Sequence, residues 1–190
     1  TGIDAATLAG TNPYSERDAT KDGFGSDTRT WLLARKAGRI SDKFDNPDMA
    51  RGRREEQEAA DLFEAWTGLR LARAKIGYLT HESGLVGASP DRRCELAPLL
   101  IEIKSKRDRF DFKVPVQYWW QMQLQMASTG HQNCVLLQYI SLRAFGSHVK
   151  LPQIHTHLVR FNEARFQDFL DRYAAPFIRD LVALRAAGDD

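Results

Sequence analysis

The segment Leu99-Leu-Ile-Glu-Ile-Lys104 constrains the fold of this chain more than any other. Its apolar residues predict a buried central β-strand. Glu102 and Lys104 interrupt this run two positions apart, so both side chains lie on one face of the strand. Alternating charges usually form a solvated strand face, but charges within an apolar strand are costly unless something neutralises them. The segment therefore predicts a sheet built around a polar site.

Helical and strand patterns surround this segment and define the fold class. Apolar spacing at three and four residues, together with glycine stops, predicts helices, and short apolar or alternating runs predict strands. The expected helices cover 30–36, 51–66, 116–128 and 162–187, the last with a kink at Pro176. The expected strands cover 69–76, 84–88, 99–103, 134–140 and 154–161. Short connections favour a meander for the first three strands. The pattern predicts a mixed α/β fold with a central sheet flanked by helices.

The length of 190 residues, 43% of them hydrophobic, suits one compact domain. We expect a turn-rich, helical N-terminal lobe without its own core over 1–50, a catalytic core over 51–161 and a long C-terminal helix over 162–187. The 27 Lys and Arg against 25 Asp and Glu give a net charge of only +2, so no bulk positive field indicates a nucleic-acid partner. Such a partner has to be argued from the placement of the charges.

Two cysteines, Cys94 and Cys134, are too few for a disulfide framework and favour a reducing compartment. No stretch approaches the roughly 18 consecutive apolar residues of a membrane span, and no secretory leader is evident. Because the chain opens on Thr1, we expect that further residues precede it. The predicted location is the cytoplasm, with no membrane partner.

A second acidic residue, Asp91, follows the strand expected at 84–88. Asp91, Glu102 and Lys104 should therefore meet at one point. Carboxylates and a backbone carbonyl, here that of Ile103, are ligands that Mg²⁺ prefers. An ammonium beside a metal suits phosphodiester hydrolysis, in which it positions water or stabilises charge on phosphate. Pro90-Asp91, ten residues, then Glu102-Ile103-Lys104 matches the PD-(D/E)xK nuclease pattern, which alone is degenerate.

The helix expected at 51–66 offers a further carboxylate. Glu55 and Glu56 both lie about half a helical step from the apolar face that Ala59, Phe63 and Trp66 define, so periodicity does not choose between them. We expect one of the two to point toward the sheet.

The helix expected at 116–128 carries a polar row. Tyr118, Gln121 and Gln125 follow one another at three- and four-residue steps, and Gln123 lies on another face. A glutamine on such a helix can hold a metal-bound water, although a solvated, glutamine-rich face explains the pattern equally well.

Four blocks of residues occur in a characteristic order between residues 52 and 130. They are Gly52-x-x-x-Glu56 running to Phe63 and Thr67-Gly68, Gly87-Ala-Ser-Pro-Asp91, Ile101-Glu102-Ile103-Lys104, and Tyr118-x-x-Gln121-x-Gln123 ending at Met126 and Thr129-Gly130. In this combination the chain resembles the lambda exonuclease and YqaJ-like viral recombinase family of the PD-(D/E)xK nucleases. The resemblance selects Glu56 as the first acidic residue of the site.

The resemblance implies a phage or prophage enzyme of the bacterial cytoplasm. Such an enzyme digests one strand of linear duplex DNA in the 5′ to 3′ direction, works as a ring-shaped trimer, and leaves a 3′ overhang for a single-strand annealing protein. It depends on Mg²⁺, with Mn²⁺ as a possible substitute, and uses two ions.

The predicted site combines metal ligands, catalytic residues and DNA contacts. Asp91, Glu102 and the Ile103 carbonyl bind metal, with Glu56 added directly or through water, while Lys104 and Gln121 handle the attacking water. Basic residues flanking this site suit phosphate neutralisation. The predicted DNA-binding residues are Arg53, Arg54, Ser89, Arg92, Lys106, Arg107 and Tyr118.

Two alternatives to an exonuclease remain open at this point. An endonuclease, resolvase or restriction enzyme can use the same site, and a circular duplex without ends distinguishes it. A non-catalytic DNA-binding module predicts missing acidic residues, whereas Glu56, Asp91, Glu102 and Lys104 are all present.

Overall fold

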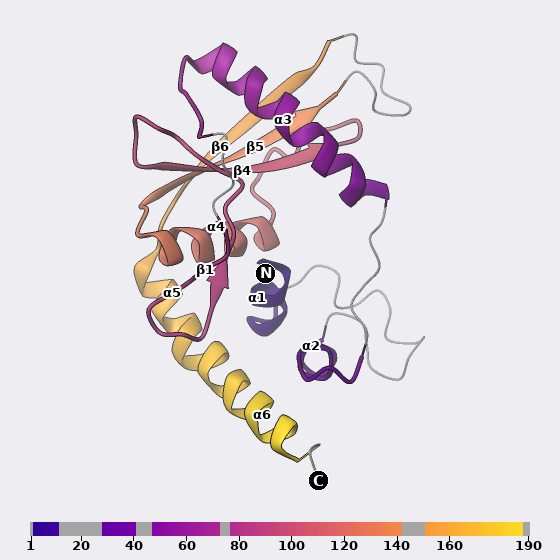
Figure 1. Ribbon diagram of the computed structural model, residues 1–190, viewed down its shortest axis with the longest axis vertical. Coiled ribbons are helices and arrows are strands. Elements are labelled where there is room, and N and C mark those ends of the chain that lie inside the picture. Colours follow the sequence, from indigo (N-terminus) through magenta and orange to yellow (C-terminus); the bar gives the residue numbers. More distant parts are fainter. Residues whose placement is uncertain (1, 12–27, 41–46, 73–76, 142–150, 188–190) are drawn as a thin grey trace.

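A four-stranded mixed sheet forms the centre of the computed structural model, which describes residues 2–11, 28–40, 47–72, 77–141 and 151–187 (Figure 1). Its strands lie in the order β3 (Arg92–Arg93), β4 (Leu99–Lys106), β5 (Asn133–Ile140) and β6 (Gln153–Arg160). β4 and β5 are parallel, and the two outer pairs are antiparallel. The strand expected at 99–103 is therefore an interior strand, and it extends to Lys106.

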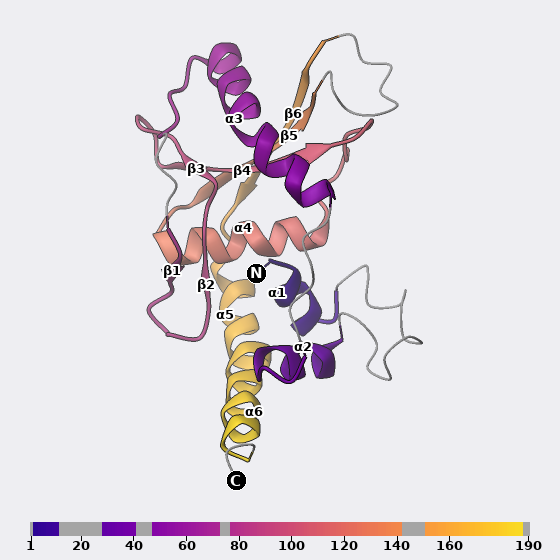
Figure 2. The same ribbon diagram turned by 45° about the vertical axis from the view of Figure 1, so that its right-hand side comes forward.

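Two helices cover the opposite faces of this sheet (Figure 2). α3 (Pro47–Thr67) packs on one face, and α4 (Val116–Thr129) lies on the other, where it forms the crossover that parallel strands require between β4 and β5. Because side chains alternate along β4, Ile101 and Ile103 join the cluster under α3, while Leu100 packs with Met122 and Met126 of α4. Glu102 shares the α4 face with Leu100.

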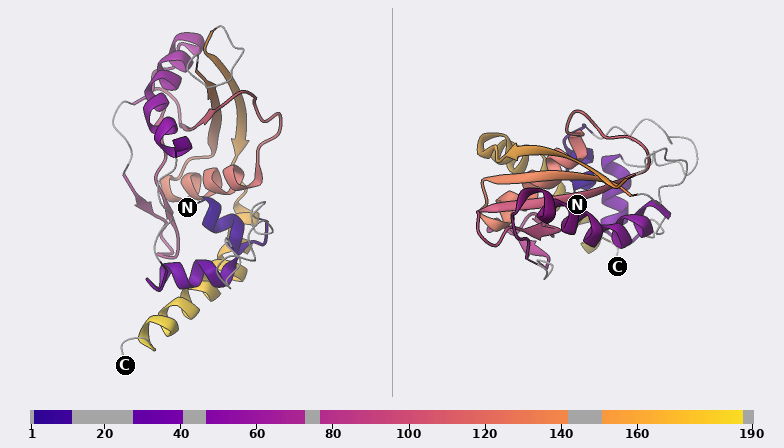
Figure 3. Two further views of the ribbon diagram at one scale, coloured as in Figure 1. Left: turned by 90° about the vertical axis from the view of Figure 1, so that its right-hand side faces the viewer. Right: turned by 90° about the horizontal axis from the view of Figure 1, so that it is seen from above.

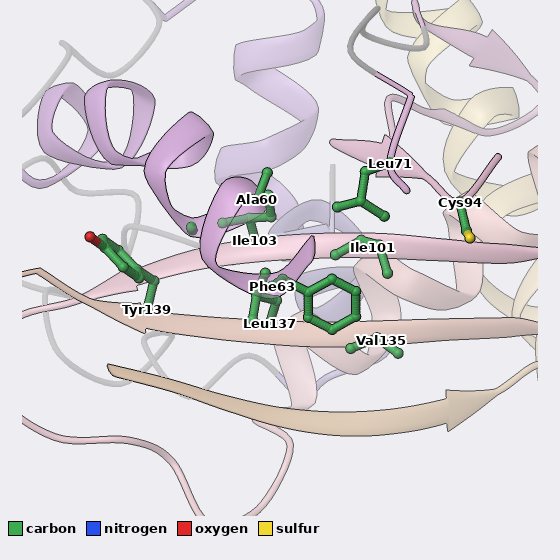
Figure 4. Packing of buried hydrophobic residues seen from close by; sticks show 10 residues of the cluster. Ala60, Phe63, Leu71, Cys94, Ile101, Ile103, Val135, Leu137 and Tyr139 are labelled. Atoms are coloured by element: carbon green, nitrogen blue, oxygen red, sulfur yellow. The ribbon is translucent and has the colours of Figure 1, made fainter. Parts of the chain in front are cut away.

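The cluster under α3 holds the sheet and this helix together. Phe63 packs over Ile101, Val135 and Leu137 (Figure 4), and its own side chain is only 3% exposed. Burying one such side chain contributes about 1.5–3 kcal/mol relative to leaving it in water. β4 is therefore fixed by apolar packing on both faces, which is what holds its charged residues in place.

The described parts of the N-terminal lobe pack on the rest of the chain (Figure 3). Ala5 and Ala6 of α1 (Gly2–Leu8) join a cluster with Trp120 of α4, and Trp31 of α2 (Arg29–Lys36) joins one with Phe177 of α6 (Ala175–Ala186). The described part of the lobe thus shares its apolar clusters with other elements. We propose that the chain forms one folding unit.

The C-terminal helix is continuous but changes its winding. Asn162 caps α5 (Glu163–Phe169) by accepting a hydrogen bond from the Arg165 amide. A π-helical turn, Leu170–Ala174, then leads directly into α6. Pro176, where the sequence suggested a kink, lies in the first turn of α6 and cannot donate a backbone hydrogen bond, so the wider turn precedes it. No helix within the described ranges is long and apolar enough to cross a membrane.

The expected meander is wrong in its first two strands. Within 69–76 only Leu71 makes a β-bridge, with Cys94, and residues 73–76 lie outside the described residues. The strand expected at 84–88 shortens to β2 (Gly87–Ala88), which pairs with β1 (Leu79–Thr80) in a separate two-stranded sheet. Pro90 follows β2 and lacks the N–H that a continued strand needs, so the chain turns there into β3.

Gly87 is required by the close approach of β1 to β2. A Cβ atom at this position would lie 2.6 Å from both the Leu79 carbonyl oxygen and the Tyr78 hydroxyl. The backbone oxygen cannot move away without separating the two strands. Gly87 therefore fixes the hairpin that leads into Asp91.

We expect Gly87→Ala to lower the free energy of unfolding by about 1–3 kcal/mol, because the added methyl group displaces β1. Urea denaturation of the purified protein measures the change. Gly77→Ala is the matched control, since a Cβ there meets nothing within 4 Å. Equal stability of the two variants would contradict the steric argument.

Candidate active site

The edge of β4 brings two acidic residues together. β3 pairs with β4 in a register that, continued by one residue, sets Asp91 opposite Glu102. Asp91 lies just before β3, and here its side chain, not its backbone, binds β4. Its Oδ2 accepts a hydrogen bond of 2.8 Å from the Ile103 N–H. Side chains opposite each other in antiparallel strands have Cβ atoms about 4.5–5.5 Å apart. The two carboxylates are therefore close neighbours.

Glu102 is completely buried, at 0% exposure, and its charge is compensated from two sides. Oε1 pairs with the ammonium of Lys104, which stands two positions along the same face of β4. Oε2 accepts a 2.6 Å hydrogen bond from Nε2 of Gln125 in α4. The same amide nitrogen lies 3.3 Å from the carbonyl oxygen of Ser89, so Gln125 also holds the turn before Asp91.

The pKa values of this group reflect its crowding. Burial and then the negative charge of Glu102 raise the pKa of Asp91 to about 8, although Lys104 and the Ile103 N–H oppose the shift. Burial by itself lowers the pKa of Lys104, but Glu102 and Asp91 outweigh it and raise the value to about 12. Lys104 therefore stays a cation at neutral pH, and the acidic pair still has an excess of negative charge once Asp91 ionises.

This donor set fits a hard divalent cation. Asp91 and Glu102 supply carboxylate oxygens, and the carbonyl of Ile103 points to the same edge of β4 as the N–H that meets Asp91. No group of three or more His, Cys, Asp and Glu side chains is arranged for a metal in the described part of the chain. The remaining ligands would be carbonyl and water oxygens, as Mg²⁺ accepts.

Glu56 and Arg92 form an ion pair on the α3 side of Asp91. Oε1 of Glu56 contacts the Arg92 guanidinium, and Glu56 is close enough to contribute to the raised pKa of Asp91. Arg92 is only 4% exposed. The sequence placed Arg92 among the DNA contacts, but the structure puts it in the interior, because its cross-strand partner Ile101 faces α3.

Glu55 also points inward, toward a different part of the sheet. Its carboxylate accepts hydrogen bonds from the hydroxyls of Ser105 and Ser141, the latter at 2.6 Å, and it is only 7% exposed. These contacts join α3 to the ends of β4 and β5. The ambiguity between the two adjacent glutamates thus resolves into two roles, and Glu56 is the one beside Asp91.

The polar row of α4 lies along β4. The ring of Tyr118 has its centre 5.1 Å from Nζ of Lys104 and 5.0 Å from Nζ of Lys106. Seven residues later Gln125 reaches Glu102. Gln121 lies between them on the same helical face, and its side chain makes no hydrogen bond to another described residue.

Two glutamines of α4, Gln125 and Gln123, make contacts that the sequence did not predict. Gln125 touches the acidic pair, and its place in the same row as Tyr118 was the signal for this contact. Gln123, on another face, accepts from the Asn162 amide at 2.8 Å and donates to the Arg160 carbonyl at 3.0 Å, which fastens α4 to the start of α5.

The other expected DNA contacts lie around the end of β4 and the start of α3, except Ser89, which lies between β2 and β3. Arg53, Arg54 and Ser89 are exposed. Lys106 pairs with Asp111, and the exposed Arg107 pairs with Asp48 of α3, with bonds of 2.8 and 3.0 Å. These residues remain predicted DNA contacts.

Comparison with known proteins decides the family. Residues 1–132 match the YqaJ-like viral recombinase domain. The chain belongs to the YqaJ-like viral recombinase family. This confirms the family predicted from the four motif blocks. No curated protein sequence matches the chain.

Solved structures share the fold of this YqaJ-like domain. An alkaline exonuclease from Laribacter hongkongensis, LHK-Exo, is 22% identical with a TM-score of 0.68, covering 99% of this chain and 90% of that one. The structure of LHK-Exo in complex with dAMP is 23% identical with a TM-score of 0.67, covering 98% of this chain and 89% of that one. A phage-related exonuclease from Haemophilus somnus 129PT is 13% identical with a TM-score of 0.68, covering 94% of each chain. The predicted mixed α/β class, a mixed sheet flanked by helices, is confirmed.

The raised pKa of Asp91 predicts how the stability of the metal-free YqaJ-like domain depends on pH. A protonated Asp91 stabilises the fold fully below the unfolded pKa of 3.8, and this contribution is lost as the pH rises through about 8. Asparagine is neutral throughout. In chelator, the free energy of unfolding of Asp91→Asn should therefore rise relative to that of the wild type as the pH rises from 4 to 9. Urea denaturation should show a difference that reaches about 1–3 kcal/mol.

The exposed Asp108→Asn variant is the control for this pH series. A difference in the free energy of unfolding between Asp91→Asn and the wild type that stays constant from pH 4 to 9 would contradict a raised pKa at Asp91.

Gln125 and Gln121 should differ in their effect on stability. Gln125→Ala leaves a buried oxygen of Glu102 without its donor, so we expect the free energy of unfolding to fall by about 1–3 kcal/mol. Gln121→Ala should change it by less than about 0.5 kcal/mol. Chemical denaturation of both variants tests this, and the reverse order would overturn the placement of Gln125 against Glu102.

Proposed function

We propose that this protein is a metal-dependent DNA exonuclease that digests one strand of linear duplex DNA from its 5′ end. The observation that carries the proposal is the buried pair Asp91 and Glu102 with Lys104 beside it on one face of β4. Membership of the YqaJ-like viral recombinase family supports an action on DNA during recombination. The exonucleases that share the fold support the exonuclease activity in this proposal.

Each residue of the site has a role in phosphodiester hydrolysis. Asp91, Glu102 and the Ile103 carbonyl would hold the divalent cation, Mg²⁺ or Mn²⁺. When bound, the cation supplies Lewis acidity toward phosphate and water. Lys104, which stays protonated, would orient the attacking water or stabilise negative charge on the scissile phosphate.

The α4 row supports this chemistry from the other side. Gln125 fixes the Glu102 carboxylate through its 2.6 Å hydrogen bond, so Gln125 is a positioning residue. Gln121, with no hydrogen bond to a described residue, is the better placed glutamine to bind water or substrate. Tyr118 offers its ring beside two lysines, and aromatic rings flanked by cations are suited to a nucleic acid strand.

The remaining features of the proposal follow from the family and from charge placement. Basic residues near the end of β4 and the start of α3 would bind the phosphates of duplex DNA, with an affinity that falls with salt. We propose a ring-shaped trimer that passes its 3′ overhang to a single-strand annealing protein. The free, buried cysteines Cys94 and Cys134 suit the reducing cytoplasm of a bacterial host carrying the phage or prophage.

A digestion assay tests the proposed activity. Linear duplex with 5′-phosphate or 5′-hydroxyl ends should lose one strand from its 5′ end when Mg²⁺ is present and stay intact in chelator. A closed circular duplex should stay whole under the same conditions. Cleavage of the circle would instead identify an endonuclease built on the same site, and no cleavage of either substrate would favour a DNA-binding module.

Lys104→Ala should reduce the rate of strand digestion by at least about 100-fold, because the protonated amine beside Glu102 is lost. Affinity for duplex DNA, measured by fluorescence anisotropy, should change little. Lys113→Ala removes an exposed lysine elsewhere and serves as the control. Full activity of Lys104→Ala would exclude the role proposed for this ammonium.

A further inference from the structure

Arg92 joins α3 to the main chain at the acidic pair. Its Nη1 contacts Oε1 of Glu56 and donates a 2.7 Å hydrogen bond to the carbonyl of Asp91, while Nη2 reaches Oε1 of Gln57 at 3.4 Å. The planar guanidinium has several donors in a fixed geometry, and one residue therefore binds three acceptors. Arg92 itself is only 4% exposed, so its charge is compensated by these acceptors rather than by bulk water.

Two cations approach the acidic residues from opposite faces of the sheet. Lys104 pairs with Glu102 on the α4 face, and Arg92 pairs with Glu56 on the α3 face. Asp91 lies between the two pairs, with its side chain on the Ile103 N–H and its carbonyl on Arg92. A buried guanidinium is tolerated only where such acceptors satisfy it.

The oxygens that Arg92 binds are of the kind that a second metal ion would use. A carboxylate oxygen of Glu56 and a main-chain carbonyl are hard oxygen donors of the kind that Mg²⁺ accepts. A guanidinium and a divalent cation cannot both occupy that space, since they would repel each other and compete for the same oxygens. The resemblance to the family implies two ions with Glu56 as a ligand, whereas these contacts favour one.

We propose that Arg92 takes the place of a second metal ion, so that the site binds one divalent cation per chain through Asp91 and Glu102. In this arrangement Arg92 is a positioning residue: it neutralises Glu56 and fixes the main chain of Asp91. The inference rests on the proposed metal-dependent function.

The number of bound ions tests this inference without reference to activity. The full chain is titrated with Mn²⁺ alone, and the free ion is measured by electron paramagnetic resonance. We expect one Mn²⁺ per chain for the wild type and for Glu56→Gln. Arg92→Gln should bind two, because the guanidinium no longer contacts Glu56 and the Asp91 carbonyl, and the double variant Arg92→Gln/Glu56→Gln should return to one.

Two further variants separate charge from position. Arg93→Gln removes the neighbouring, exposed arginine of β3 and should still bind one ion. Arg92→Lys keeps the positive charge but loses the planar guanidinium with its several donors. We therefore expect one ion, bound about 10-fold more weakly. Under activity conditions, Arg92→Lys should lower kcat while leaving KM for DNA unchanged, as a residue that positions the site without touching DNA should.

Two ions in the wild type, reduced to one in Glu56→Gln, would overturn the inference, and this comparison holds even if Arg92→Gln fails to fold by circular dichroism. A folded Arg92→Gln that still binds one ion would also overturn it. One bound ion without any nuclease activity would contradict the proposed function but support the count. No bound ion in the wild type would contradict both.

Discussion

The structure depends on two carboxylates held next to each other in the interior. Asp91 and Glu102 repel one another, and burial raises the cost of their charge. Neighbouring groups offset that cost: Lys104 and Gln125 bind the oxygens of Glu102, and the Ile103 N–H binds Asp91. This local neutralisation is incomplete once Asp91 ionises. The remaining negative charge is what makes the site suited to a divalent cation.

The two faces of β4 give these groups separate surroundings. Apolar residues pack under α3 and under α4, so the strand cannot slip by one residue without moving its charges into the apolar cluster under α3. On the α4 face the row from Tyr118 to Gln125 follows Glu102, Lys104 and Lys106. On the α3 face Arg92 and Glu56 form their own pair. The sheet therefore both separates and aligns the cationic and acidic groups.

Sequence patterns predicted the long elements well because those elements have regular apolar periodicity. α3, β4, α4, β5 and β6 all lie close to their expected ranges. The short strands were missed, since β3 has two residues and is defined only by pairing with β4. The shortened β2 has a similar origin: Pro90 and the close approach at Gly87 decide where it ends. Neither constraint has a periodic signature. The π-helical turn before Pro176 likewise arises from local backbone geometry.

The sequence alone determined which charged residues gather at one point: Asp91 follows one short strand, and Glu102 and Lys104 share a face of an apolar strand. The motif blocks also determined the family. Tertiary structure alone decided the partners of each charge. Whether Arg92 faces DNA or Glu56 depends on which face of the sheet its strand presents, and that is set by pairing with β4. Contacts between residues distant in the chain follow from packing, which a local pattern does not encode.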